Sequence, residues 1–302
     1  MRRSAVAAAL LVCTPLLVAQ DRAQLAVGGA KLEVVFSERP LEPLRTAVLD
    51  WIGTSARAVT HYHERFPVPR VEIRVRQDDG RGARNGTSYG WNGALITITV
   101  GRASTAADFA ADWLMPHEML HLGFPSVPER HHWIEEGIST YVEPIARARA
   151  GLISAEEAWG DLVRGLPQGL PQAGDRGLDT TPTWGRTYWG GAIFCLLADV
   201  EIRKRTGNRR GLEHALRAIV RAGGTIEARW KIERAIEIGD RATGVPVLRE
   251  LYEKMRAAPA PTDLDALWKQ LGIERRGRQI SFNDAAPLAH IRAAITERAV
   301  QP

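Results

Sequence analysis

His117-Glu118-Met119-Leu120-His121 has the spacing H-E-x-x-H, and the interpretation of the whole 302-residue chain begins from it. On an α-helix, residues four apart return to nearly the same face, so the two histidines can direct their imidazoles at one metal ion. Glu118 projects about a quarter of a turn away, beside such an ion, where a carboxylate can take a proton from water. The spacing therefore predicts a helical zinc site with Glu118 as a general base.

A zinc site of this kind needs a third protein ligand, and several residues after His121 can supply it. Glu136 is separated from His121 by fourteen residues. That interval suits a turn followed by a second helix that packs against the first, so Glu136 is the expected ligand. The alternatives are two histidines at the start of the second helix and the adjacent glutamate, which would face about 100° away: His131, His132 and Glu135.

The residues on either side resemble the gluzincin metallopeptidases, in which H-E-x-x-H is followed by W-x-x-E-G-x-x-x-Y, here Trp133 to Tyr141. The resemblance aligns Glu136 with the third ligand of a single zinc ion. A second block, Tyr188-Trp189-Gly190-Gly191 and the segment after it, is similar to a stretch of the glycyl-aminopeptidase family and, more distantly, of aminopeptidase N. In those enzymes the tyrosine steadies the tetrahedral intermediate, so the resemblance implies that role for Tyr188.

The chemistry of Tyr188 agrees with this role, because a neutral phenol can donate a hydrogen bond to an oxyanion. The other interpretation is an aromatic side chain that packs at the start of a helix. The chain departs from the family at Gly190, which replaces a lysine, and in the shorter interval before Glu136. Residues 85–90 stand where an edge strand beside the cleft is expected, and they contain no carboxylate. The resemblance thus implies the hydrolytic residues of a peptidase without an anchor for a free amino terminus.

Hydropathy patterns predict an α+β fold with a small N-terminal β-sheet and a mostly helical C-terminal half, and the resemblance implies that this fold is of the zincin type. Residues 32–36, 71–75 and 94–100 have strand patterns, 80–86 is expected to be a loop, and spacing from 106 onward is mostly helical. Pro116 either starts or kinks the metal-binding helix. We expect the sheet and metal-binding helices in 21–150, a helical subdomain that completes the cleft in 151–257, and a C-terminal cap in 258–302.

The first twenty residues are typical of a secretory signal peptide, with two arginines followed by a short apolar run. This run is shorter than the roughly 20 apolar residues of a membrane-spanning helix. We therefore expect an exported protein, periplasmic or secreted, with no integral membrane segment once the signal is cleaved. The only cysteines are Cys13 and Cys195, so cleavage would leave one thiol and no internal disulfide.

The composition is that of an ordinary globular protein, with 45% hydrophobic and 25% charged residues. The net charge of +5 comes from 40 basic and 35 acidic residues and is too small to predict a nucleic-acid partner. The sequence predicts an exported zinc peptidase that acts on peptides or proteins. The alternatives are a non-catalytic binding or scaffold protein on a peptidase-like fold, and a zinc hydrolase of non-peptide amides.

Overall fold

A five-stranded sheet forms the N-terminal part of the computed structural model, which describes residues 21–298. The expected signal segment, residues 1–20, lies outside this range. The strand order is β1-β2-β3-β5-β4, so β4 is an edge strand. The strands are β1 (Asp21–Val27), β2 (Ala30–Phe36), β3 (Arg70–Asp78), β4 (Ala83–Tyr89) and β5 (Ala94–Gly101).

The sheet combines parallel and antiparallel pairs. Helix α1 (Leu44–His63) connects β2 to its parallel neighbour β3, and β5 is parallel to β3. Strand β4 runs antiparallel to β5, and its register shifts between Arg84 and Thr87. This shift is a β-bulge, a feature that re-aims side chains and is frequent beside active sites.

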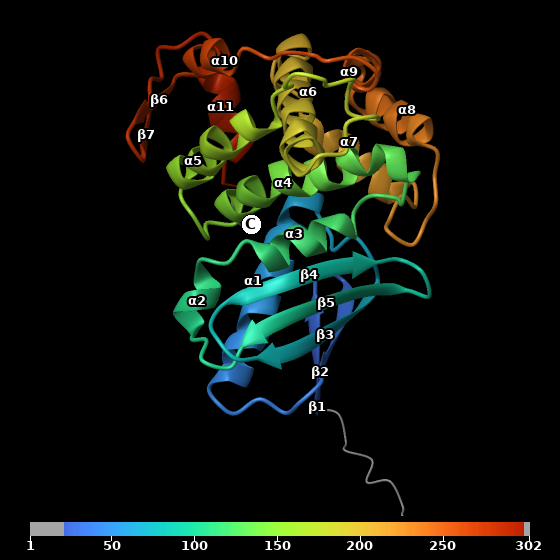
Figure 1. The fold of residues 1–302 in the computed structure, drawn as a ribbon, viewed down its shortest axis with the longest axis vertical. Coiled ribbons are helices and arrows are strands. Elements are labelled where there is room, and N and C mark those ends of the chain that lie inside the picture. Colours follow the sequence, from blue (N-terminus) through green and yellow to red (C-terminus); the bar gives the residue numbers. More distant parts are fainter. Residues whose placement is uncertain (1–20, 299–302) are drawn as a thin grey trace, which may run out of the picture.

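A layer of helices covers the sheet, with α3 lying along β4 and α4 lying along α3 (Figure 1). The other helices and a short hairpin lie mostly on the far side of α4. The helices are α2 (Ala106–Ala110), α3 (Leu114–His121), α4 (His132–Arg149), α5 (Ala155–Gly165), α6 (Gly191–Arg205), α7 (Leu212–Arg221), α8 (Ile232–Thr243), α9 (Val247–Met255), α10 (Leu264–Leu271) and α11 (Ala289–Thr296), and the hairpin strands are β6 (Ile273–Arg276) and β7 (Gln279–Phe282).

Helix α4 is the central helix of this layer, and it packs closely against α6. A Cβ atom added to Gly137 would lie only 2.3 Å from the backbone carbon of Gly191. Two glycines therefore let the backbones of α4 and α6 meet without intervening side chains. This contact packs α6 against the part of α4 that carries Glu136, the residue that precedes Gly137.

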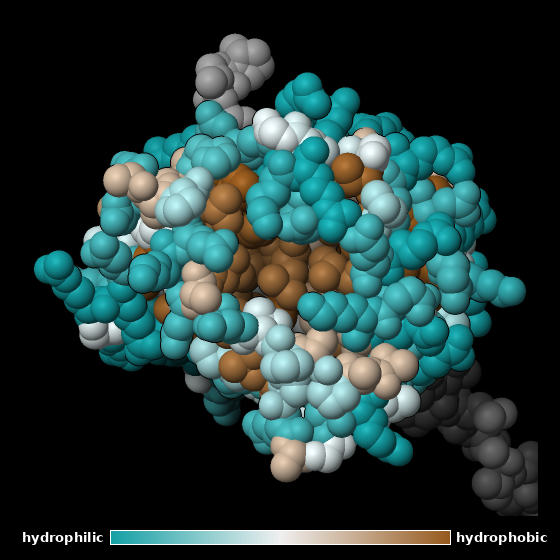
Figure 2. All heavy atoms as spheres, turned by 90° about the horizontal axis from the view of Figure 1, so that it is seen from above, coloured by the Kyte–Doolittle hydropathy of each residue, from teal (hydrophilic) through white to brown (hydrophobic). Residues whose placement is uncertain are grey.

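The helical layer also presents a hollow lined by apolar residues, on the face at the top of Figure 1 where α6, α9 and α10 lie. Figure 2 shows this hollow at the centre of the face, surrounded by hydrophilic residues. It lies on the side of the helical layer remote from the sheet. Within residues 21–298, none of the helices combines the length and the apolar character needed to cross a bilayer.

The predicted fold class, α+β with an N-terminal sheet and a helical C-terminal half, is confirmed. Strand β4 lies where an edge strand was expected at residues 85–90, but it begins at Ala83, within the segment 80–86 that was expected to be a loop because its sequence is polar and contains glycine. Such a composition suits an exposed edge. Strand β1 was not predicted. Pro116 lies in the first turn of α3, so the metal-binding helix starts there rather than bending.

His63, at the C-terminal end of α1, is a buried histidine only 4% exposed. Burial, aided by the positive charges of Arg217 and Arg65, lowers its pKa to about 3. The folded protein therefore keeps His63 neutral at pH values where the unfolded chain, with a pKa near 6.5, takes up a proton. The contribution of neutral His63 to the free energy of unfolding is fully present above pH 6.5 and is lost as the pH falls toward 3.

We predict that His63→Gln makes the stability of the metal-free protein less sensitive to acid. Between pH 7 and pH 4.5 the wild type should lose roughly 2–3 kcal/mol more unfolding free energy than the variant. Urea unfolding at both pH values measures the difference, with the exposed His290→Gln as a control that retains the wild-type slope. Equal losses of unfolding free energy in wild type and His63→Gln would show that burial of His63 does not cause the acid sensitivity.

Candidate metal centre

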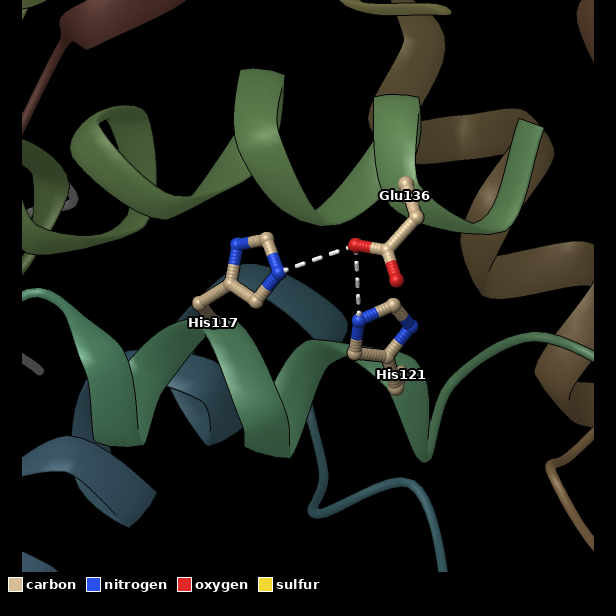
Figure 3. Close-up of side chains that lie close together, drawn as sticks. All are labelled: His117, His121 and Glu136. Carbon is tan, nitrogen blue, oxygen red and sulfur yellow. Dashed lines mark hydrogen bonds and ion pairs between the residues drawn. The ribbon is translucent and has the colours of Figure 1, made fainter. Parts of the chain in front are cut away.

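Helix α3 presents His117 and His121 on the face that looks toward α4 (Figure 3). The helix begins beside Asp112, whose carboxylate accepts hydrogen bonds from the backbone N–H groups of Leu114 at 2.9 Å and Met115 at 3.3 Å. This cap satisfies donors at the helix N-terminus and fixes where the helix starts. Because the two histidines are four residues apart, they lie one turn from each other with ring centroids 5.0 Å apart.

Glu136 projects from α4 between the two imidazoles. Its Oε2 lies 3.2 Å from Nε2 of His117 and 3.4 Å from Nε2 of His121. Figure 3 shows both rings directed at this one oxygen. The carboxylate is buried, with Glu136 only 8% exposed. Two helices that are separate in the sequence thus bring three potential ligand atoms within 4.8 Å of one another.

The geometry of these three side chains fits a zinc ion. Zinc binds nitrogen and oxygen ligands at about 2.0–2.1 Å in a tetrahedral arrangement, which places neighbouring donor atoms about 3.3 Å apart. The observed separations of 3.2 Å and 3.4 Å match this requirement. Two imidazoles and one carboxylate are also a ligand set of catalytic zinc sites, which leave a fourth position for water or substrate.

The charge state of Glu136 also suits a metal ligand. Burial alone would raise the pKa of its carboxyl group, but hydrogen bonds with His117, His121 and His132 outweigh burial and hold that pKa well below its usual range. The group is therefore a carboxylate at any pH at which the protein functions. An anionic oxygen buried between two imidazoles attracts a cation.

The alternative ligands considered from the sequence have other partners. Nδ1 of His131 lies 2.9 Å from Oδ1 of Asp179, which connects the residue before α4 to the loop between α5 and α6. Glu135 accepts a hydrogen bond of 2.7 Å from the backbone N–H of Val127. Neither residue joins the cluster of three donors.

His132 contacts the cluster from outside it. Its Nε2 lies 3.2 Å from Oε1, the second carboxylate oxygen of Glu136. Its Nδ1 lies 2.9 Å from Oε2 of Glu135. His132 therefore links the two neighbouring glutamates and restricts the rotation of the Glu136 carboxylate. Contacts of this kind orient metal ligands and strengthen metal binding.

Glu118 and Tyr188 lie beside the cluster. Glu118 is only 5% exposed, and its Oε2 accepts a hydrogen bond of 2.7 Å from the hydroxyl of Ser88 on β4. Tyr188 lies in a π-helical turn, Arg186–Gly190, and its ring stacks on that of His117 with centroids 6.3 Å apart. Burial and the nearby charges of Glu136 and Glu118 raise the pKa of Tyr188 to about 12. The phenol therefore keeps its proton and can donate a hydrogen bond.

The five residues predicted from the sequence border one cavity of about 690 Å³. A second cavity of about 950 Å³ continues from it past His117 and Tyr188. The second cavity contains more apolar side chains, among them Trp113, Leu152, Leu162, Trp184 and Trp189. The arrangement is a long cleft with the three donors, Glu118 and Tyr188 near its middle.

Sequence reasoning missed the part that Ser88 plays at this site. The segment 85–90 was expected to lie beside the cleft, but spacing along the chain cannot show that a serine thirty residues before Glu118 reaches its carboxylate. The bulge in β4 and the packing of β4 against α3 bring them together.

Solved structures of zinc metallopeptidases share this fold. An aminopeptidase N family protein from Idiomarina loihiensis aligns with a TM-score of 0.60 and 14% identity, over 84% of this chain and 49% of that chain. An M1 zinc metallopeptidase mutant from Deinococcus radiodurans aligns with a TM-score of 0.51 and 13% identity, over 80% of this chain and 53% of that one. A two-domain M1 zinc metallopeptidase mutant bound to L-tryptophan aligns with a TM-score of 0.53 and 14% identity, over 80% of this chain and 52% of that chain.

The structural likeness confirms the fold expected from the resemblance to gluzincins and aminopeptidase N. The chain spans about half the length of these structures. No family profile and no curated protein sequence matches it. At 13–14% identity, the likeness to these structures establishes the fold alone.

We predict that His132→Ala weakens zinc binding by roughly 10–100-fold, because the Glu136 carboxylate loses the partner of its second oxygen. Competition with a chromophoric zinc chelator measures the dissociation constant. His290→Ala, which removes an exposed histidine, is the matched control and should bind zinc as the wild type does. An unchanged affinity in His132→Ala would show that His132 does not orient the ligand.

Proposed function

We propose that this chain is an exported peptidase that uses one zinc ion held by His117, His121 and Glu136. The observation that carries the proposal is the meeting of the three donor atoms within 4.8 Å, in the fold of the M1 zinc metallopeptidases. Glu118 and Tyr188 border the same cavity and supply a base and a hydrogen-bond donor. Export is inferred from the charged and apolar first twenty residues alone.

In the proposed mechanism, zinc supplies a Lewis acid that lowers the pKa of water to about 7 and polarises a carbonyl group. Glu118 takes a proton from the attacking water and passes it to the nitrogen of the leaving amine. The hydroxyl of Tyr188 donates a hydrogen bond to the oxyanion that forms as water adds to the carbonyl carbon. Tyr188 can do so throughout because its pKa is raised to about 12.

The cleft supports a peptide as the substrate. Strand β4 is an edge strand beside the site, and an extended peptide can pair with the free backbone groups of such a strand. The apolar cavity beyond Tyr188 offers the indole rings of Trp113 and Trp184 to a side chain near the scissile bond. No specific feature of the site favours a scaffold protein or a hydrolase of non-peptide amides.

We predict that Glu118→Gln lowers peptide hydrolysis by roughly 10²–10⁴-fold while zinc remains bound, because the amide cannot accept the proton. Mass spectrometry of a mixed peptide pool with free and blocked amino termini measures cleavage, and atomic absorption measures zinc. The wild type should cleave peptides, and removal of zinc with a chelator should stop the cleavage. A Gln variant as active as the wild type would refute the assignment of Glu118.

Tyr188→Phe should lower kcat by roughly 10²–10³-fold with little change in KM, since the lost hydrogen bond forms only as the oxyanion develops. Tyr252→Phe removes a phenol hydroxyl outside both cavities and is the matched control. Steady-state kinetics on a peptide from the pool separates the two constants. A pure increase in KM would reassign Tyr188 to substrate binding.

A further inference from the structure

Strand β4 makes a direct polar contact with Glu118. The hydroxyl oxygen of Ser88 lies 2.7 Å from Oε2 of Glu118 and 2.8 Å from the backbone carbonyl oxygen of the same residue. A hydroxyl group has one hydrogen, and an ionised carboxylate is a stronger acceptor than a carbonyl group. Ser88 therefore donates to Oε2 whenever Glu118 is ionised, and the backbone carbonyl oxygen is the alternative acceptor.

Gly86, two residues earlier on β4, makes room for the same carboxylate. A Cβ atom at this position would lie 2.7 Å from Oε1 and 2.8 Å from Cγ of Glu118. Any other residue at position 86 would displace the glutamate. The bulge between Arg84 and Thr87 lies at this point of the strand. The strand thus accommodates Glu118 by shape at Gly86 and binds it by a hydrogen bond at Ser88.

We propose that Ser88 is a positioning residue that holds Glu118 in the orientation needed for proton transfer. This inference rests on the proposed function, in which Glu118 is the general base. With Oε2 held by Ser88, Oε1 is the oxygen left for the proton. Water loses that proton to Oε1 as its oxygen bonds to the carbonyl carbon, and the proton moves to the amine nitrogen as the carbon–nitrogen bond breaks. Ser88 keeps its own proton throughout.

The contact matters because Glu118 is buried, and few other groups can donate a hydrogen bond to its carboxylate. Ser88 donates the one hydrogen bond that the structure gives to the carboxylate of Glu118 among the described residues. A hydrogen bond to a charged group in such a setting is worth about one to two orders of magnitude in an equilibrium or a rate. Loss of the hydroxyl should therefore lower the rate of the chemical step and leave substrate binding largely unchanged.

The first test compares Ser88→Ala and Ser88→Thr in the zinc-loaded protein. We expect Ser88→Ala to lower kcat by roughly 10–100-fold with KM within about threefold of wild type and full zinc content. Ser88→Thr keeps the hydroxyl and should restore kcat to within a few-fold. Thr97→Ala removes a hydroxyl from β5, where Thr97 pairs with Thr87 and not with Ser88, and should leave both constants unchanged. Wild-type kcat in Ser88→Ala would overturn the proposal.

The second test measures the contact without any substrate, by thermal unfolding of a double-mutant cycle. Ser88→Ala should lower the melting temperature by roughly 2–6 °C when residue 118 is glutamate. It should have a smaller effect when Glu118 is already alanine, because the hydroxyl then has only the backbone carbonyl of residue 118 as an acceptor. An equal loss in both backgrounds would overturn the proposal, because the serine would then stabilise the fold without acting through Glu118.

Together the tests distinguish failure of this inference from failure of the proposed function. A wild type that cleaves peptides, with a Ser88→Ala variant that cleaves them equally well, overturns only the role of Ser88. A zinc-loaded wild type that cleaves no peptide overturns the proposed function and with it the catalytic role of Ser88. In that case thermal coupling between Ser88 and Glu118 would show that the contact exists and that the error lies in the assigned activity.

Discussion

The contact between α3 and α4 is the constraint on which the rest of this structure depends. It places one carboxylate oxygen of Glu136 at 3.2 Å and 3.4 Å from two imidazole nitrogens, and neither helix alone could do so. On the sheet side, α3 packs against β4. On the opposite side, α4 packs against α6 through the close approach of Gly137 and Gly191. The sheet and the helical layer therefore together determine the distance between the carboxylate of Glu136 and the two imidazole rings.

The electrostatics of the site favour a cation. Two carboxylates, Glu118 and Glu136, are buried in one small region. Glu136 is held ionised by hydrogen bonds with three histidines, whereas burial and the same negative charges keep Tyr188 protonated by raising its pKa to about 12. A divalent ion at the three donors would balance the buried negative charge. The site thus keeps the phenol of Tyr188 in the protonated form, in which it can donate a hydrogen bond.

Local regularities explain why much of this could be predicted from the sequence. Helical spacing relates His117 to His121, and the β-branched run 94–100 predicts β5. The choice of Glu136 needed the resemblance as well, because packing between helices decides which of several nearby side chains faces the histidines. The start of strand β4 at Ala83 and the contact of Ser88 with Glu118 could not be predicted. Both depend on a bulge and on the pairing of distant segments, which leave no periodic signal.

X-ray absorption spectroscopy at the zinc edge of purified protein tests whether His117, His121 and Glu136 bind one zinc ion. We expect one zinc ion per chain, with scattering from two imidazole rings and an additional oxygen ligand at about 2.0–2.1 Å. In Glu136→Ala the imidazole scattering should persist in any zinc that remains, with weaker binding. Protein that takes up no zinc, or zinc whose spectrum lacks imidazole scattering, would contradict the account.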